Sequence, residues 1–537
     1  MANTIKFGNG QWATKEDSIL AYNDENANFK PLPFVTSRAS TATTVNKSGL
    51  LETVASGVPR VDYLDNSKGS YLIEPSSTNL IIQSEAFGNG FWNKEGSTIE
   101  GDASTAGSDV LSGFNFTNWS TIGGASIVDS DTFNSTSSGG IRKDGLITSG
   151  KTYLITIAGT TDATGFTFQN YGLGITYKTI PSGAFNETFY IEAEDAGFYL
   201  RNNGAYTTNV TTFSVKEVQG FSAPSVDSPL GAFKLVEDTS NGKHLIQSSS
   251  YSYVSGNSYS ISIYAKKDGV DRLYFSNSGL GGSVFNLDNG SVVSIGGNNA
   301  YFTNHTAKVE SLDNGWFRLS VSKDCVQNIN GSSRFYLGSG SSSYQGDGTS
   351  GVYIFASQLE QNSYATSYIP TKGSQISRLS ESASQTLSDG IIGQTEGTLY
   401  WEGKFYKTSI LMQIAPSIGG NYTKSLYMEY VQSSNKIIIQ VWDNGVKQAE
   451  LTYTAVNVGT TYKIALAYKQ NDINVFVNGS SIGTSTSSTI QSGLNKLFIG
   501  HLIGYSTDNT YIGSSVNCAK LYNTRLSNSE LQTLTTI

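Results

Sequence analysis

Apolar and polar residues alternate along most of the chain, which is the pattern of half-buried β-strands. The pattern recurs in three similar stretches, "SGKTYLITIAG" (149–159), "SGNSYSISIYA" (255–265) and "VGTTYKIALAY" (458–468). In each stretch a glycine turn precedes a tyrosine, and apolar residues then occupy every second position. The spacing between the stretches is too long and too uneven for a solenoid or propeller. We therefore predict the same kind of strand in three separate β-modules.

Asp-Asn-Gly tripeptides predict antiparallel hairpins, because Asn-Gly accepts the left-handed backbone that a tight turn requires. They occur in "VFNLDNGSVVSI" (284–295), "AKVESLDNGWFRLSVS" (307–322) and "IIIQVWDNGVKQAEL" (437–451). Near the end of the chain, Ser527 precedes Glu530 by three residues, a capping-box pattern that predicts one short helix. The fold class expected is all-β, with several antiparallel β-sandwich (jelly-roll) domains in series, one inserted in another, and an irregular N-terminal arm.

The order of these patterns predicts how the chain divides into domains. Residues 1–80 lack regular periodicity and hold four of the nine prolines, so we expect an extended arm that must rest on another part to be ordered. A strand pattern begun in residues 81–103 resumes later, with a complete strand set between its halves. The domains expected are an outer jelly roll (81–103 plus 221–375), an inserted jelly roll (104–220), a connector (376–394) and a C-terminal sandwich (395–537).

Composition supports a folded β-protein and excludes some partners. The chain has 537 residues, of which 38% are apolar and 15% charged, with 57 glycines and 31 tyrosines. The net charge of −8, with no cationic cluster longer than Lys266–Lys267, argues against a nucleic-acid partner. The two cysteines, Cys325 and Cys518, fall in different modules, so the sequence predicts neither a disulfide framework nor a zinc site. We expect two buried thiols.

The N-terminal sequence "MANTIKFGNGQW" has no apolar stretch of signal-peptide length, and no run of about 18 apolar residues occurs in the chain. We therefore expect synthesis in a cytoplasm without standard export, and no membrane insertion. The polar, tyrosine-rich β-modules nevertheless suit an extracellular surface. A virus particle released by lysis satisfies both conditions, which gives the virion surface as the expected location.

The C-terminal region resembles a known family. The segments "IALAYKQNDINVFVNGSSIGT" (464–484), "KLFIGH" (496–501) and "AKLYNTRLSNSELQTL" (519–534) look like the closing half of a laminin-G or concanavalin A-like lectin sandwich. The resemblance covers roughly residues 395–537. It implies binding of glycan or protein, often with calcium, so calcium stays open while no other cofactor is expected.

The front of the chain resembles a second group. The segments "RASTATTVNKSGLLETVASGVPRVDY" (38–63), "LDNGWFRLSVS" (312–322) and "QLEQNSYATSYIPT" (358–371) look like segments that recur in tailed-phage head fibres, tail fibres and spikes with carbohydrate-binding-like jelly rolls. This resemblance implies a phage virion protein for host attachment. Its expected partners are other virion proteins, bound through the N-terminal arm, and a host-surface glycan. Because such fibres are commonly trimeric, the resemblance also implies a homotrimer. Whether the protein belongs to the head or the tail of the particle stays open.

Sugar binding needs aromatic faces and short polar side chains on a rigid support. The stretches "FTFQNYGLG" (166–174) and "YLRNNGAY" (199–206) place such side chains beside turns. The candidate glycan-binding residues are Trp119, Asn170, Tyr171, Arg201, Asn202, Asn203 and Tyr206. The alternative is that the aromatics belong to the core and the asparagines only shape turns.

Two N-terminal aromatics, Phe7 and Trp12, have no core of their own in the irregular arm. They are candidates for docking onto a capsid or tail protein, and the alternative is packing on the first module.

No motif for catalysis stands out. The three histidines lie in no pattern with a nucleophile, and the alternating carboxylates of "IVDSDTF" (127–133) and "YIEAEDAG" (190–197) are typical of solvated strand faces. Neither pattern has EF-hand-like spacing, so the metal assignment stays unknown. We therefore expect no enzymatic activity. A polysaccharide depolymerase and a ligand-free head decoration protein are the alternatives.

Overall fold

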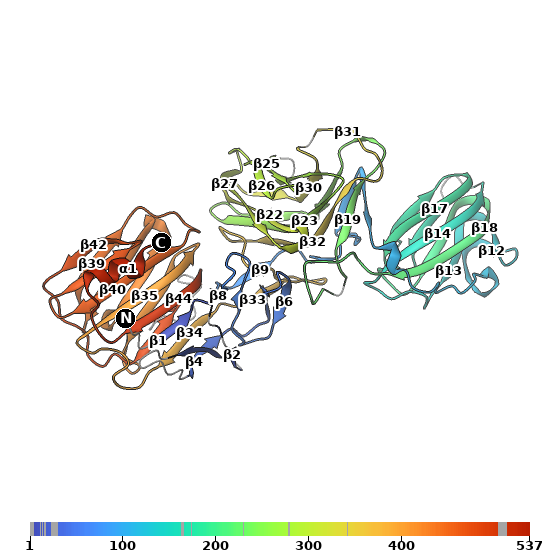
Figure 1. Cartoon of the computed structure of the whole chain (residues 1–537). Coiled ribbons are helices and arrows are strands. Elements are labelled where there is room, and N and C mark those ends of the chain that lie inside the picture. The colour runs from blue at the N-terminus through green and yellow to red at the C-terminus, as the bar shows by residue number, and fades with distance from the viewer. Residues whose placement is uncertain are drawn as a thin grey trace.

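Antiparallel strands form almost all of the regular structure in the computed structural model. The structure describes residues 5–10, 12, 14–15, 18–22, 31–162, 166–172, 174–228, 230–277, 280–340, 342–502 and 513–537. Within these ranges one α-helix occurs, α1 (Asn528–Thr535), and no helix there has the length and apolar character needed to cross a membrane. The predicted all-β fold class is confirmed. Figure 1 shows three bodies, in which the two ends of the chain share one.

Each of the three repeated stretches forms a strand within one of these bodies. The strands are β14 (Thr152–Thr161), β23 (Ser258–Asp268) and β40 (Tyr462–Lys469). In each, the buried tyrosine hydroxyl accepts a hydrogen bond from the backbone N–H five residues earlier. The pairs are Thr148 and Tyr153, Val254 and Tyr259, and Asn457 and Tyr462, at 2.9, 3.0 and 2.7 Å. The repeated sequence therefore ties a turn to the strand that follows it, in the manner of a tyrosine corner.

The outer sandwich consists of two six-stranded sheets that enclose one core. The first sheet orders β10 (Trp92–Glu95), β21 (Leu245–Ser248), β30 (Ser333–Leu337), β24 (Arg272–Asn277), β25 (Leu280–Asn286) and β26 (Ser291–Ser294). The second orders β11 (Ser97–Glu100), β19 (Phe233–Glu237), β32 (Gly351–Glu360), β23, β28 (Phe317–Cys325) and β27 (Phe302–Ser311). The predicted hairpins at Asn289–Gly290 and Asn314–Gly315 are confirmed as the β25–β26 and β27–β28 connections.

The inserted module occupies a hairpin loop of the outer sandwich. Strands β11 and β19 are antiparallel neighbours, with Glu100 opposite Lys234, and the module lies between them in sequence. Its strands are β12 (Ser120–Ile127), β13 (Thr132–Lys143), β14, β15 (Phe166–Asn170), β16 (Thr176–Ile180), β17 (Gly183–Glu192) and β18 (Phe198–Val218). Strand β18 pairs with β13 and β15 along its first part and with β14 along its second. The module closes over its own aromatic core.

The C-terminal sandwich holds the largest core, and strands from the two ends of the chain build it together (Figure 1). Its C-terminal strands are β35 (Glu396–Phe405), β36 (Ser409–Ala415), β37 (Leu426–Val431), β38 (Lys436–Asp443), β39 (Val446–Tyr453), β40, β41 (Ile473–Val477), β42 (Ser480–Ser485), β43 (Lys496–Ile499) and β44 (Ser514–Tyr522). The strands that join them are β1 (Ile5–Gly8), β2 (Thr14–Lys15), β3 (Ser18–Tyr22), β4 (Pro31–Ser37), β7 (Val61–Asp62), β8 (Ser70–Ile73) and β34 (Ser382–Thr386).

Short elements complete the described structure. Two-stranded pairs form between β5 (Ala42–Val45) and β6 (Leu51–Val54), β9 (Ser77–Asn79) and β33 (Ile376–Arg378), β20 (Asn241–Gly242) and β31 (Tyr344–Gln345), and β22 (Tyr251–Tyr253) and β29 (Ile329–Gly331). Single 3-10 turns are η2 (Ala103–Thr105), η3 (Phe116–Asn118), η4 (Asp313–Gly315), η5 (Tyr422–Lys424) and η6 (Gln432–Ser434). Helix α1 begins with the predicted capping box, in which Ser527 accepts from the Glu530 N–H and the Glu530 carboxylate accepts from the Ser527 N–H.

The pairing of β1 with β44 corrects the expectation that residues 1–80 form a separate arm. Ile5 lies opposite Leu521 and Gly8 opposite Cys518, and strand β4 pairs with β34 of the predicted connector. Phe7 is 1% exposed in the core of the C-terminal sandwich. The proposed docking role of Phe7 is therefore wrong, because its partners lie inside this chain.

Trp12 behaves in the same way. Its ring packs edge-on against Phe7 with centroids 5.4 Å apart, and its indole N–H donates to the Lys68 carbonyl at 2.8 Å. The side chain is half-buried against the same core. The alternative reading, packing within the molecule, fits both aromatics.

Candidate functional site

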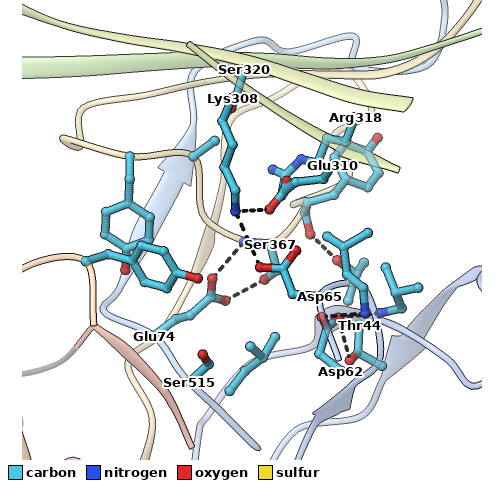
Figure 2. Close-up of a pocket in the computed structure, with 18 of the residues that line it drawn as sticks. Thr44, Asp62, Asp65, Glu74, Lys308, Glu310, Arg318, Ser320, Ser367 and Ser515 are labelled. Atoms are coloured by element: carbon cyan, nitrogen blue, oxygen red, sulfur yellow. Dashed lines mark hydrogen bonds and ion pairs between the residues drawn. The ribbon is translucent and has the colours of Figure 1, made fainter. Parts of the chain in front are cut away.

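A cavity of about 190 Å³ lies where the N-terminal segment, the outer sandwich and the C-terminal sandwich meet. Figure 2 shows Lys308 of β27 reaching into it toward Glu310 and Asp65. The Lys308 Nζ lies 3.6 Å from Asp65 Oδ2, and Lys404 Nζ of β35 lies 2.8 Å from the same oxygen. Asp65 therefore links a lysine of the outer sandwich to one of the C-terminal sandwich.

The electrostatics of this cavity favour its ion pairs. Burial lowers the pKa of Lys308, but the attraction of Glu310 and Asp65 outweighs it and holds the pKa above its usual range. Burial raises the pKa of Asp65, and the two lysines reverse this effect, so its pKa lies below the usual range. The charged groups satisfy one another, which suits a junction between modules.

A buried ion network lies beside the cavity and joins the N-terminal segment to the connector at residues 378–381. Arg60 lies 2.8 Å from Glu74 and donates from Nε to Glu381 Oε1 at 2.9 Å. Arg38 reaches the same Glu381 oxygen at 2.6 Å, and Arg378 lies 3.1 Å from Glu74. Both carboxylates have a pKa below the usual range, because the arginines outweigh the effect of burial.

Asp62, in the cavity wall, predicts a pH-dependent stability. Burial raises its pKa to about 6, against hydrogen bonds from the Val45 and Leu64 N–H groups, and nearby Glu310 adds to the rise. An unfolded aspartic acid ionises near pH 4. Stability from the protonated carboxyl is therefore fully present below about pH 4 and lost as pH rises through about 6.

We expect wild type to lose about 2–3 kcal/mol of unfolding free energy relative to Asp62→Asn between pH 4 and pH 7. Urea unfolding at a series of pH values measures the difference. A constant difference between the two proteins across this range would contradict a raised Asp62 pKa.

Three of the predicted glycan-binding residues are buried in the inserted module, which corrects their proposed role. Trp119 is 8% exposed and packs against Phe116, with ring centroids 5.2 Å apart. Asn170 accepts from the Ile175 N–H at 2.7 Å, and Asn202 accepts from the Thr208 hydroxyl at 3.1 Å. These side chains belong to the core or hold turns.

Among the remaining candidates, Asn203 is exposed, and Tyr171 and Arg201 are half-buried. Tyr206 is also half-buried and packs partly against the core. Residues of β18 alternate, so that Arg201 and Asn203 face away from the core together with Tyr199. Glycan binding by these surface residues stays a prediction.

A surface of four side chains gathers here, which we call the tyrosine–arginine face: Arg142, Tyr171, Tyr199 and Arg201. Arg142 of β13 lies opposite Tyr199 of β18, and Arg201 follows two residues later on the same face. The Arg142 guanidinium lies 4.5 Å from the centre of the Tyr171 ring. The sequence patterns did not identify Arg142 or Tyr199 as candidates. The in–out alternation of "FYLRNN" (198–203) contains the signal for Tyr199, and "GGIRKDG" contains none for Arg142.

Asp195 fixes the turn that carries Tyr171. Its carboxylate accepts from the Tyr171 N–H at 3.2 Å, the Gly172 N–H at 2.6 Å and the Asn170 side-chain amide at 3.2 Å. Asp195, one of the carboxylates of "YIEAEDAG", therefore has a structural role in holding this turn. In the part of the chain that the structure describes, no three His, Cys, Asp or Glu side chains gather to hold a metal ion.

Comparisons with known proteins support the C-terminal resemblance. Residues 398–532 match the family model of the concanavalin A-like lectin/glucanases superfamily. No curated protein matches the chain.

Solved structures with local similarity are remote. The IT-sialidase CBM40 of Ruminococcus gnavus bound to α2,3-sialyllactose is 19% identical, covering 27% of this chain and 84% of its own, with a TM-score of 0.24. A SAP-like pentraxin from Limulus polyphemus is 16% identical, covering 26% and 69%, with a TM-score of 0.23. Mouse laminin α1 domains LG4-5 are 12% identical, covering 51% and 86%, with a TM-score of 0.20. The family match shows that the C-terminal module is similar to laminin-G-type domains of the concanavalin A-like lectin/glucanases superfamily.

Proposed function

We propose that this chain is a phage virion protein, a head or tail fibre or spike, that adheres to host-surface glycan without chemical catalysis. The observation that carries the adhesive role is the tyrosine–arginine face of the inserted module, supported by the lectin-type C-terminal domain. Aromatic rings can cover the apolar face of a sugar while arginines and amides bind its oxygens. Figure 1 shows the inserted module projecting away from the other two bodies, which suits display toward a partner.

On the virion, the proposed form of the protein is a homotrimer at the particle surface that needs no cofactor. Repeated copies convert weak sugar contacts into stable capture, because the second contact becomes intramolecular. Because Phe7 is buried in the C-terminal sandwich, attachment to other virion proteins through the N-terminal segment would use other residues of that segment. Electron microscopy of labelled particles tests the location, and binding that survives a calcium chelator tests the absence of a cofactor.

Removing Tyr199 is expected to weaken glycan binding about tenfold, which corresponds to ~1.4 kcal/mol, because a sugar would lose its aromatic contact. A glycan array followed by calorimetry on the best ligand compares wild type with Tyr199→Ala. The matched control is Tyr190→Ala, a half-buried tyrosine on β17, which pairs with β14 away from this face.

Three outcomes would overturn parts of the proposal. Equal losses in Tyr199→Ala and Tyr190→Ala would remove the face from the binding role. An array blank for the whole chain would favour a ligand-free decoration protein. Release of reducing sugars from a capsular polysaccharide would show a depolymerase.

A further inference from the structure

We propose that the tyrosine–arginine face selects acidic saccharides, with a sugar carboxylate bound between Arg142 and Arg201. The inference rests on the proposed function of glycan adhesion and adds the chemical class of the ligand. No assigned role explains why two half-buried arginines lie on one face of a module whose described ion pairs use lysine.

The sheet register brings the two arginines within reach of one carboxylate. Arg142 is directly opposite Tyr199, so Arg201 is its diagonal neighbour across the β13–β18 pair. Diagonal neighbours in an antiparallel sheet lie about 7–8 Å apart at the backbone, within the reach of long side chains. The residue opposite Arg201 on β13 is Gly140, which has no side chain to cover it. Both arginine side chains are half-buried, so each keeps a part that a ligand group can reach from solvent.

Among the described residues, neither guanidinium group forms an ion pair with a carboxylate. In the described part of this module the ion pairs are Lys151 with Glu217 at 2.8 Å and Lys178 with Glu187 at 3.1 Å. Neither Arg142 nor Arg201 pairs with a described carboxylate, and Arg142 Nε is buried without a hydrogen-bond partner. Asp195, the acidic residue of the neighbouring turn, already accepts from Asn170, Tyr171, Gly172 and Gly197.

Neighbouring residues also hold the Arg142 guanidinium in position in the absence of a ligand. Arg142 stacks on Tyr171, and the turn that carries Tyr171 is fixed by Asp195. Guanidinium groups bind carboxylates through two parallel hydrogen bonds, which a neutral sugar cannot accept in the same geometry. Because a preorganised side chain loses less conformational freedom on binding, the arrangement favours an acidic ligand over a neutral one.

The test compares polysaccharides that differ only at the carboxyl group. Immobilised hyaluronan, polygalacturonate and polysialic acid, each beside its carboxyl-reduced form, are probed with the full chain by surface plasmon resonance. Dextran and dextran sulfate serve as the neutral and the non-carboxylate anionic polymers. We expect binding to at least one carboxylated polymer, a loss of tenfold or more on carboxyl reduction, and weakening by added salt.

Variants of the full chain assign the effect to the face. Arg142→Ala and Arg201→Ala are expected to lower binding tenfold or more, and Arg201→Gln provides a second variant of the same site that retains hydrogen bonding. The control is Arg334→Ala in the outer sandwich, whose arginine also lacks an ion pair with a described residue and whose Nη1 lies 3.5 Å from the Tyr336 hydroxyl. Circular dichroism verifies the fold of each variant.

The outcomes separate this inference from the proposed function. Binding of neutral glycans that the arginine variants leave unchanged would refute acidic selection and leave glycan adhesion standing. Equal binding of dextran sulfate and the carboxylated polymers, without an effect of carboxyl reduction, would refute recognition of a carboxylate. If no polymer and no array glycan bound, both the inference and the adhesive function would fail.

Discussion

Replacing Glu381 with alanine is expected to lower the free energy of unfolding by about 3–5 kcal/mol. The Glu381 side chain is fully buried and pairs with Arg38 and Arg60, which are also buried. Without it, Glu74 is the one carboxylate among the described residues whose ion pairs balance this arginine group, through Arg60 and Arg378. Breaking a buried ion network from one side is costly because the remaining charges have lost their water and gain no new partner.

Chemical denaturation followed by tryptophan fluorescence measures this loss. The matched control is Glu450→Ala, since Glu450 pairs with Lys447 at 2.6 Å at the surface and should contribute less than about 1 kcal/mol. The intermediate variant Glu381→Gln keeps the shape and loses the charge. Similar losses in Glu381→Ala and Glu450→Ala would show that the network does not stabilise the junction.

Replacing Phe7 with alanine is expected to destabilise the C-terminal sandwich by about 3–5 kcal/mol. Phe7 fills a space between Trp12, Phe34 and Tyr71, with ring centroids 5.4, 5.4 and 5.6 Å away. Deletion of the ring leaves a cavity in a core that β1 closes through its pairing with β44. Differential scanning calorimetry of the full chain shows the effect as a lower melting temperature for the transition of this sandwich.

A surface substitution in the same sandwich provides the comparison. Val446 is 60% exposed, so Val446→Ala should leave the transition within about 0.5 kcal/mol of wild type. An unchanged melting temperature for Phe7→Ala would mean that β1 is not part of the folded core, and that the N-terminal aromatics are free to dock elsewhere.

Features with local causes could be predicted from the sequence. The Asn444–Gly445 pair forms a two-residue turn between β38 and β39 with φ values of 45° and 88°, as the Asn-Gly rule requires. The two cysteines are buried and free, and Ser527 with Glu530 caps the helix. In each case, neighbours within a few residues of one another determine the geometry.

Features that depend on distant segments could not be predicted. Nothing near Ile5 shows that its strand partner is Leu521 at the other end of the chain. The same distinction applies to the candidate site. The alternation along its strand could predict that Arg201 faces away from the core, but only the β13–β18 register brings Arg142 beside it. Asn170 resembled a ligand-binding amide, but its neighbours Ile175 and Asp195 occupy its hydrogen bonds.

The inserted module leaves and rejoins the chain at two adjacent, hydrogen-bonded strands, β11 and β19. A foreign domain needs only termini that lie one strand spacing apart to replace it, because loop closure is then already satisfied. The inserted module could therefore be exchanged in a single recombination event while the supporting scaffold keeps its sequence. Under the proposed adhesive function, a new target would then be acquired by exchange of the whole module rather than by gradual substitution.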